Sequence, residues 1–213
     1  MTDDFVKTWE QKRGNISSSL FEELFPRPPM RERITHTIFK LNSIQKRLED
    51  SSARMKSKDK TLFQKCVKAQ KAKDTYSSTM YANEIAQLRN MANIIVNSQI
   101  AMEQVILRLE TVRDFGDISM EILPVAKIMR TIKNSLSGVI PEISYMLGDG
   151  CCTLDELVMD VGQVTSSNYH TVTSGDAEKI LAEASAVAEQ KMKDSFPSLP
   201  STSLSESGLD LHK

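Results

Sequence analysis

The chain has 213 residues, of which 40 % are hydrophobic and only 6 % aromatic, and its formal net charge is -1. With 8 glycines and 7 prolines it is poor in the turn residues that a many-stranded domain requires, which argues against a β fold. We therefore predict an all-α protein, built as a long helical hairpin with a basic first helix, a very long second helix and short acidic helices at the C-terminal end.

Residues 1–30 form an N-terminal segment with amphipathic character. Phe5 and Trp9 lie one helical turn apart, and the cations Lys12 and Arg13 follow closely. Large apolar side chains beside cations are typical of a short helix that lies in the lipid head-group layer. The pattern is equally compatible with these side chains packing back onto the hairpin.

Residues 31–115 contain neither glycine nor proline, so no helix breaker interrupts this stretch. The polar run 56–59 has no apolar anchor, and we place the turn of the hairpin there, between a helix of about 25 residues and one of about 55. Apolar residues recur in a seven-residue pattern typical of coiled-coil packing, with Asp74 as the interruption: Ile34, Ile38, Leu41, Leu48, Met55, Val67, Tyr81, Leu88, Ile95, Met102 and Leu109.

A basic stripe runs along the first helix, because Arg33, Lys40, Arg47 and Arg54 are spaced by seven and stay on one face. Such a stripe attracts anionic lipid head groups or nucleic acid phosphates. Aromatic side chains are nearly missing from it, so bases have no stacking platform and we expect no nucleic acid partner. An ordinary solvated helix face is the alternative. Further lysines extend the charge through the predicted turn: Lys56, Lys58, Lys60, Lys65, Lys68, Lys71 and Lys73.

The charges are separated along the chain. Residues 31–73 hold 13 Lys and Arg against 4 acids, whereas residues 114–213 hold 7 against 15. This separation predicts a basic working surface and an acidic C-terminal part that folds back on it or meets another subunit. Two independently solvated helix faces would give the same counts.

Beyond Gly116 we expect several short helices, since Pro124, Gly138 and Pro141 divide residues 118–147. The turn residues Gly148 to Gly150 are expected to end this segment. Thr153 to Glu156 fits a capping box, which predicts a helix over residues 154–161. Residues 163–174 are expected to be a linker, and residues 176–193 a further helix.

The tail, residues 195–213, is rich in serine and proline and is expected to be disordered when free. It contains Phe196, Pro197, Leu199 and Pro200, in which large apolar side chains alternate with prolines. Proline favours an extended backbone and lowers the entropy lost on docking, so Phe196 and Leu199 suit a groove between helices of a partner. A plain linker is the alternative interpretation.

No catalytic site is predicted. The histidines His36, His170 and His212 have no metal ligands at the usual spacings, and phosphate-loop and nucleophile-elbow motifs are missing. We therefore expect no enzyme activity, metal or cofactor, and reduced thiols at the three cysteines. No apolar run approaches the roughly 18 residues of a spanning helix, and no signal peptide is evident, so we expect a cytoplasmic protein.

Taken in order, these parts resemble the ESCRT-III family, and in particular archaeal CdvB-type proteins. The resemblance covers residues 31–163 and lies on RERITHTIFKLNSIQKRLE, NEIAQLRNMANIIVNSQIAMEQVILRLETV and PVAKIMRTIKNSLSGVIPEISYML. It divides the chain into an N-terminal segment (1–30), an ESCRT-III-like core (31–163), a linker with a C-terminal helix (164–194) and a tail (195–213). With so few residues after the last helix, we expect a short paralogue without a winged helix.

The resemblance implies a subunit that polymerises with other ESCRT-III-like subunits on the inner face of the cell membrane and drives constriction or scission at the division site. It implies membrane binding by the basic stripe with Phe5 and Trp9, and an autoinhibited form in which acidic helices cover the hairpin. It also implies that the tail binds the MIT domain of an AAA ATPase through Phe196, Pro197, Leu199 and Pro200. A BAR-like curvature-binding dimer and a soluble coiled-coil adaptor are the competing interpretations.

Overall fold

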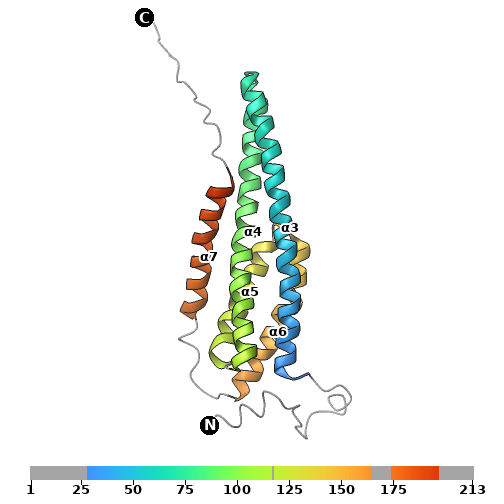
Figure 1. Ribbon diagram of the computed structural model, residues 1–213, viewed down its shortest axis with the longest axis vertical. Coiled ribbons are helices and arrows are strands. Elements are labelled where there is room, and N and C mark those ends of the chain that lie inside the picture. The colour runs from blue at the N-terminus through green and yellow to red at the C-terminus, as the bar shows by residue number, and fades with distance from the viewer. Residues whose placement is uncertain (1–27, 117, 165–173, 197–213) are drawn as a thin grey trace, which may run out of the picture.

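The computed structural model describes residues 28–116, 118–164 and 174–196, and the description below is limited to them. These residues form helices without strands, which confirms the all-α prediction (Figure 1). The helices are α3 (Met30–Lys71), α4 (Thr75–Phe115), α5 (Ile118–Ser137), α6 (Pro141–Val164) and α7 (Ser174–Ser195).

Helices α3 and α4 form the long antiparallel hairpin that dominates the molecule (Figure 1). Their lengths are 42 and 41 residues, which correspond to about 60 Å each at the rise of an α-helix. The predicted seven-residue pattern supplies its contact: the fully buried side chains include Ile34, Leu41, Leu48, Ile95, Met102 and Leu109. Repeated burial of these side chains, rather than helix propensity, stabilises arms of this length.

The turn of the hairpin is at residues 72–74, so the predicted turn at residues 56–59 is wrong, as are the predicted arm lengths. Lys73 adopts a positive φ of 58°, and the Asp74 carboxylate accepts a hydrogen bond of 3.0 Å from the Ser77 backbone N–H, which caps α4. The residue that interrupts the heptad pattern in the sequence is therefore the one that starts the second arm.

The polar run 56–59 continues as helix because its members divide between solvent and core. Lys56 and Lys58 point into solvent, which a helix interior tolerates, while Asp59 turns inward and is bound by Arg89 of α4. A polar run of this kind ends a helix only when its backbone polar groups find other partners. Here the lysines are solvated and Asp59 is paired with Arg89, so the helix remains intact.

Helices α5 and α6 form a second, shorter hairpin that packs on the first. Gly138 and Pro141 separate them as predicted, but α5 continues through Pro124 and α6 through residues 148–150. A Cβ at Gly150 would lie 3.4 Å from Met129 Cε of α5 and 3.8 Å from Leu41 Cδ2 of α3, so α6 packs against both helices at this position. The predicted capping box at Thr153 is also wrong, since its hydroxyl donates to the Asp149 carbonyl within α6 at 3.0 Å.

Helix α7 confirms the helix predicted over residues 176–193 and lies along α4 (Figure 1). Its buried side chains Ala177, Ile180, Ala184 and Ala188 form one stripe at helical spacing. Val187, which lies between Ala184 and Ala188 in the sequence, is exposed. Buried residues from each of the five helices join in one continuous core.

Candidate membrane interface

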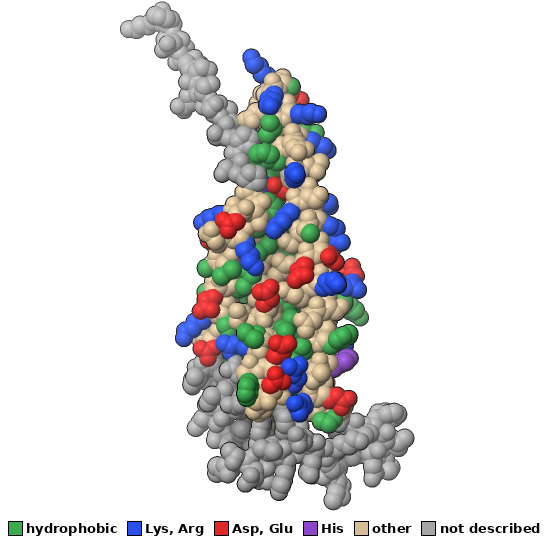
Figure 2. All heavy atoms as spheres, in the orientation of Figure 1, with side chains coloured by type: hydrophobic (Ala, Val, Ile, Leu, Met, Phe, Trp, Pro, Cys, Tyr) green, Lys and Arg blue, Asp and Glu red, His purple; other side chains and the backbone are tan. Residues whose placement is uncertain are grey.

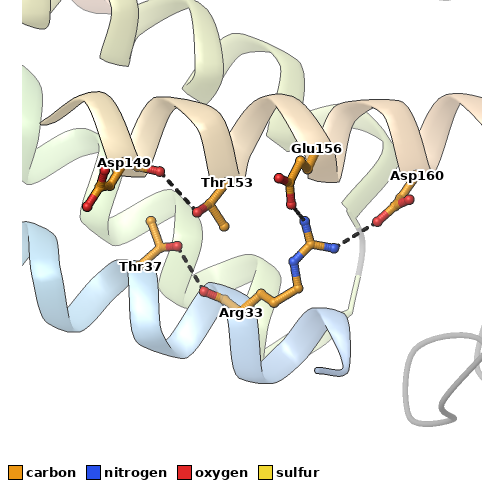
Figure 3. Close-up of polar contacts among 6 residues, drawn as sticks. All are labelled: Arg33, Thr37, Asp149, Thr153, Glu156 and Asp160. Atoms are coloured by element: carbon orange, nitrogen blue, oxygen red, sulfur yellow. Dashed lines mark hydrogen bonds and ion pairs between the residues drawn. The ribbon is translucent and has the colours of Figure 1, made fainter. Parts of the chain in front are cut away.

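The first residue of the basic stripe, Arg33, is covered by α6. Its Nη2 donates to Oε2 of Glu156 at 2.7 Å and its Nη1 to Oδ2 of Asp160 at 2.8 Å (Figure 3). Glu156 and Asp160 are four residues apart, so they project from the same face of α6 and hold the guanidinium between them. Arg33 is only 9 % exposed, although the sequence analysis placed it on a lipid-facing surface.

The next two stripe residues also meet acids of α6. Lys40 Nζ lies 3.5 Å from Oδ2 of Asp149, and Arg47 Nη1 lies 3.1 Å from Oε1 of Glu142. Both pairs are exposed, so each contributes at most about 1 kcal/mol. Arg54 lies beyond the first residue of α6, and its Nη2 donates to the Ser51 hydroxyl of its own helix at 3.0 Å.

Two charge ladders of opposite sign therefore face each other. The acids Glu142, Asp149 and Glu156 are spaced by seven, as are the cations Arg33, Lys40 and Arg47, and the two helices run antiparallel. Helix α6 carries no Lys or Arg at all. The acidic spacing is visible in the sequence, and a search for heptads of negative charge would have found the residues that the sequence analysis missed.

The far end of the hairpin carries a second cationic surface, which we call the hairpin tip and define as residues 56–84. Its lysines Lys56, Lys58, Lys60, Lys65, Lys68, Lys71 and Lys73 are all exposed. The tip extends past α5, α6 and α7, and basic side chains are prominent there (Figures 1 and 2). Tyr76, which is 83 % exposed, and Met80 add apolar surface beside the cations. No acid of α6 reaches this end.

Comparison of the sequence with those of known proteins shows the family of the chain. The chain is 38 % identical over 204 residues to Cell division protein B1 of Sulfolobus acidocaldarius, and the match covers 95 % of this chain and 92 % of that protein. The chain belongs to the CdvB family of ESCRT-III-type proteins. This CdvB chain is also 32 % identical over 168 residues to Cell division protein B of the same organism, covering 78 % of its own length and 64 % of that relative. No family model and no solved structure matches.

The remaining candidate residues of the CdvB chain are only partly described. Of the tail residues, Phe196 is described and is buried against α4. The following lie outside the described residues: Phe5, Trp9, Lys12, Arg13, Pro197, Leu199 and Pro200.

Cysteine chemistry does not add a site to this surface. All three thiols are free, and burial raises the pKa of Cys151, which keeps that side chain protonated. Among the described residues, no three His, Cys, Asp or Glu side chains are grouped to hold a metal ion. Within the same ranges no helix is long and apolar enough to cross a bilayer.

Proposed function

We propose that this CdvB-family chain is a filament subunit that binds membranes and constricts or cuts them in archaeal cell division. The observation that carries the proposal is the pairing of the basic stripe of α3 with the acidic ladder of α6. A cationic surface covered by a helix of the same chain suits a subunit that is held inactive until the cover leaves.

The ion pairs between α3 and α6 are weak enough for α6 to be released from the stripe. Arg33 makes the one ion pair of the ladder whose cation is buried, whereas Lys40 and Arg47 make exposed pairs of small net value. Anionic lipid head groups offer these three cations negative charge, as the acids of α6 do. Each cation near the bilayer surface gains about 1 kcal/mol from this attraction. A membrane therefore competes with α6 for the stripe.

The hairpin tip supplies a first contact that needs no release. Its seven lysines are exposed while α6 covers the stripe. Attraction to an anionic surface then brings the subunit to the inner face of the membrane as a peripheral protein. Once there, the released stripe lies on the lipid and the freed α6 is available to a neighbouring subunit.

Two partners complete the proposal. The subunit assembles with copies of itself and with other ESCRT-III-like subunits through the long hairpin. The MIT domain of an AAA ATPase binds the tail through Phe196, Pro197, Leu199 and Pro200, and the ATPase remodels the polymer. The alternation of apolar residues with prolines supports this assignment, because it suits a narrow groove between helices.

The test is cosedimentation and electron microscopy with vesicles that contain an anionic lipid. We expect filaments on these vesicles, and more of them for the variant Glu142→Gln, Asp149→Asn, Glu156→Gln, which removes the ladder charges that hold the stripe. The matched control changes three exposed acids of α7, Glu183→Gln, Glu189→Gln and Asp194→Asn, and should behave as the unaltered chain.

The competing functions give other results. Isolated dimers on tubulated vesicles would indicate a curvature-binding dimer of BAR type. An absence of binding at low salt would exclude both membrane functions and leave a soluble coiled-coil adaptor. Equal gains from the α6 and α7 variants would show that net charge, and not release of the stripe, controls binding.

A further inference from the structure

Phe196, the first apolar residue of the tail, is docked on the hairpin. It follows α7 directly, and its backbone N–H donates to the Met192 carbonyl at 3.0 Å, which extends the last turn of the helix. The side chain is only 7 % exposed. Its ring lies 5.4 Å from Cζ of Arg89, a cation–π distance.

Arg89 is held in place for this contact by the other arm of the hairpin. Its Nε donates to Oδ1 of Asp59 at 2.7 Å and its Nη2 to Oδ2 at 3.1 Å, a bidentate pair. Asp59 is 3 % exposed and Arg89 17 %. The guanidinium therefore has a fixed position before Phe196 arrives, so docking the ring costs little side-chain entropy of the arginine.

Phe196 carries much of the attachment of the C-terminal end of α7. The buried stripe of this helix consists mainly of alanines, which pack closely but bury little area each. Ile180 lies near the other end, 16 positions before Phe196. Between Ile180 and Phe196 the fully buried residues of α7 are Ala184 and Ala188, and Met192 is partly buried against the core. Release of the phenylalanine would therefore free the last turns of α7 first.

We propose that Phe196 has two mutually exclusive docking sites: the Asp59–Arg89 pair of its own hairpin, and the groove of the ATPase MIT domain. This inference rests on the proposed function, which supplies the second site. A ring with so little exposed surface cannot enter another groove, so the MIT domain binds only subunits in which the end of α7 has left α4. The ATPase thus distinguishes released subunits from folded-back ones.

The experiment measures the affinity of the purified MIT domain for the tail in three contexts. These are a peptide of residues 190–213, the full chain, and the full chain with Asp59→Asn and Arg89→Gln. The double variant removes both charges of the pair together, so that no unpaired charge is left, and it takes away the cation under the ring. Arg113→Gln is the matched control, because it removes a partly exposed arginine near the other end of α4 that pairs with Asp114.

We expect the peptide to bind more tightly than the full chain, and the double variant to recover a large part of the difference. Loss of a cation–π contact corresponds to roughly 2- to 30-fold in affinity. The Arg113 variant should bind as the unaltered chain does, and Phe196→Ala should abolish binding in both the peptide and the chain.

Amide hydrogen exchange measures the docking of Phe196 on α4 without the MIT domain. The double variant and Phe196→Ala should both exchange faster over residues 188–196, while α5 and α6 stay protected. Unchanged exchange there would overturn the docking role of Phe196. It would also show that the helix end is held by its alanines and Met192.

The outcomes separate this inference from the proposed function. Equal affinities of peptide and full chain would overturn mutual exclusion and leave the ATPase contact standing. A peptide that fails to bind the MIT domain would remove the ATPase contact and with it the second docking site. In that case the exchange experiment still decides whether Phe196 holds α7.

Discussion

Arg33 of α3 and Asp160 of α6 are 127 positions apart in the sequence, yet Nη1 of the arginine lies 2.8 Å from Oδ2 of the aspartate. The same arginine holds Glu156, so one cation joins the start of the hairpin to the last turns of α6. Since the other ladder pairs are exposed, this cation contributes most of the electrostatic attachment of α6 to α3.

Arg33→Gln should therefore destabilise the protein more than Lys40→Gln. The first change removes charge-assisted hydrogen bonds to two carboxylates, and we expect the free energy of unfolding to fall by about 1–3 kcal/mol. The second removes an exposed pair and should cost less than about 1 kcal/mol. Urea unfolding measures both, and amide exchange should show the loss of protection concentrated in α6. Equal effects of the two variants would refute the special role of Arg33.

Breaking the buried Asp59–Arg89 pair of the hairpin should lower the free energy of unfolding more than Arg33→Gln does. Asp59→Ala leaves Arg89 without its carboxylate in a largely buried position, and breaking such a pair costs about 3–5 kcal/mol. Replacing both residues by leucine should recover most of this stability, because no uncompensated charge remains. Chemical denaturation of Asp59→Ala and of the double leucine variant measures the two free energies of unfolding. A double variant as unstable as Asp59→Ala would show that the pair itself, and not the orphaned charge, accounts for the loss.

Much of the fold could be predicted from the sequence, because burial in a helical hairpin follows a simple period. Leu41, Leu48 and Met102 were identified by their spacing alone and are fully buried. The turn could not be placed in the same way. A polar run is compatible with a turn or with a solvated helix, and the difference depends on Asp59 finding Arg89, 30 positions away.

The site was predicted less completely for a related reason. The spacing of Arg33, Lys40 and Arg47 showed that they share a face, but not what lies opposite that face. That depends on how α5 and α6 return along the hairpin, which involves contacts between residues far apart in the sequence. For Phe196 no sequence pattern indicated an internal partner, because a cation–π contact has no spacing rule.

The turn of the hairpin predicts a dependence of stability on pH. Hydrogen bonds from the Ser77 hydroxyl and backbone N–H lower the pKa of Asp74 below its usual value of 3.8. A lowered pKa in the folded state means that the ionised carboxylate stabilises the fold above the unfolded-state pKa. That contribution is lost as the pH falls through the folded-state value.

Asp74→Asn tests this dependence, since asparagine also caps helices but does not titrate. The unaltered chain should lose more stability than the variant when urea midpoints are compared at neutral pH and below the usual carboxyl pKa. Asp74→Ala removes the cap and should be the least stable of the three at neutral pH. Parallel pH profiles for the aspartate and asparagine forms would exclude Asp74 as the titrating group.

The two cationic surfaces should be used at different stages of membrane binding. In the folded-back chain the tip is exposed and the stripe is covered, so Lys65→Ser, Lys68→Ser, Lys71→Ser should weaken binding to anionic vesicles. At about 1 kcal/mol per lysine the loss is about 3 kcal/mol, or roughly 100-fold in affinity. The salt dependence of binding should become shallower as well, because fewer charges meet the surface.

The stripe should matter only after α6 is released. Lys40→Ser and Arg47→Ser, which remove the two cations paired with Asp149 and Glu142, should have little effect in the unaltered chain. They should weaken vesicle binding once Glu142, Asp149 and Glu156 are replaced by their amides. Vesicle cosedimentation of the four combinations measures this coupling between stripe and ladder. Additive losses in both backgrounds would mean that α6 does not control access to the stripe. Filament loss with unchanged lipid binding would instead assign Lys40 and Arg47 to a contact between subunits.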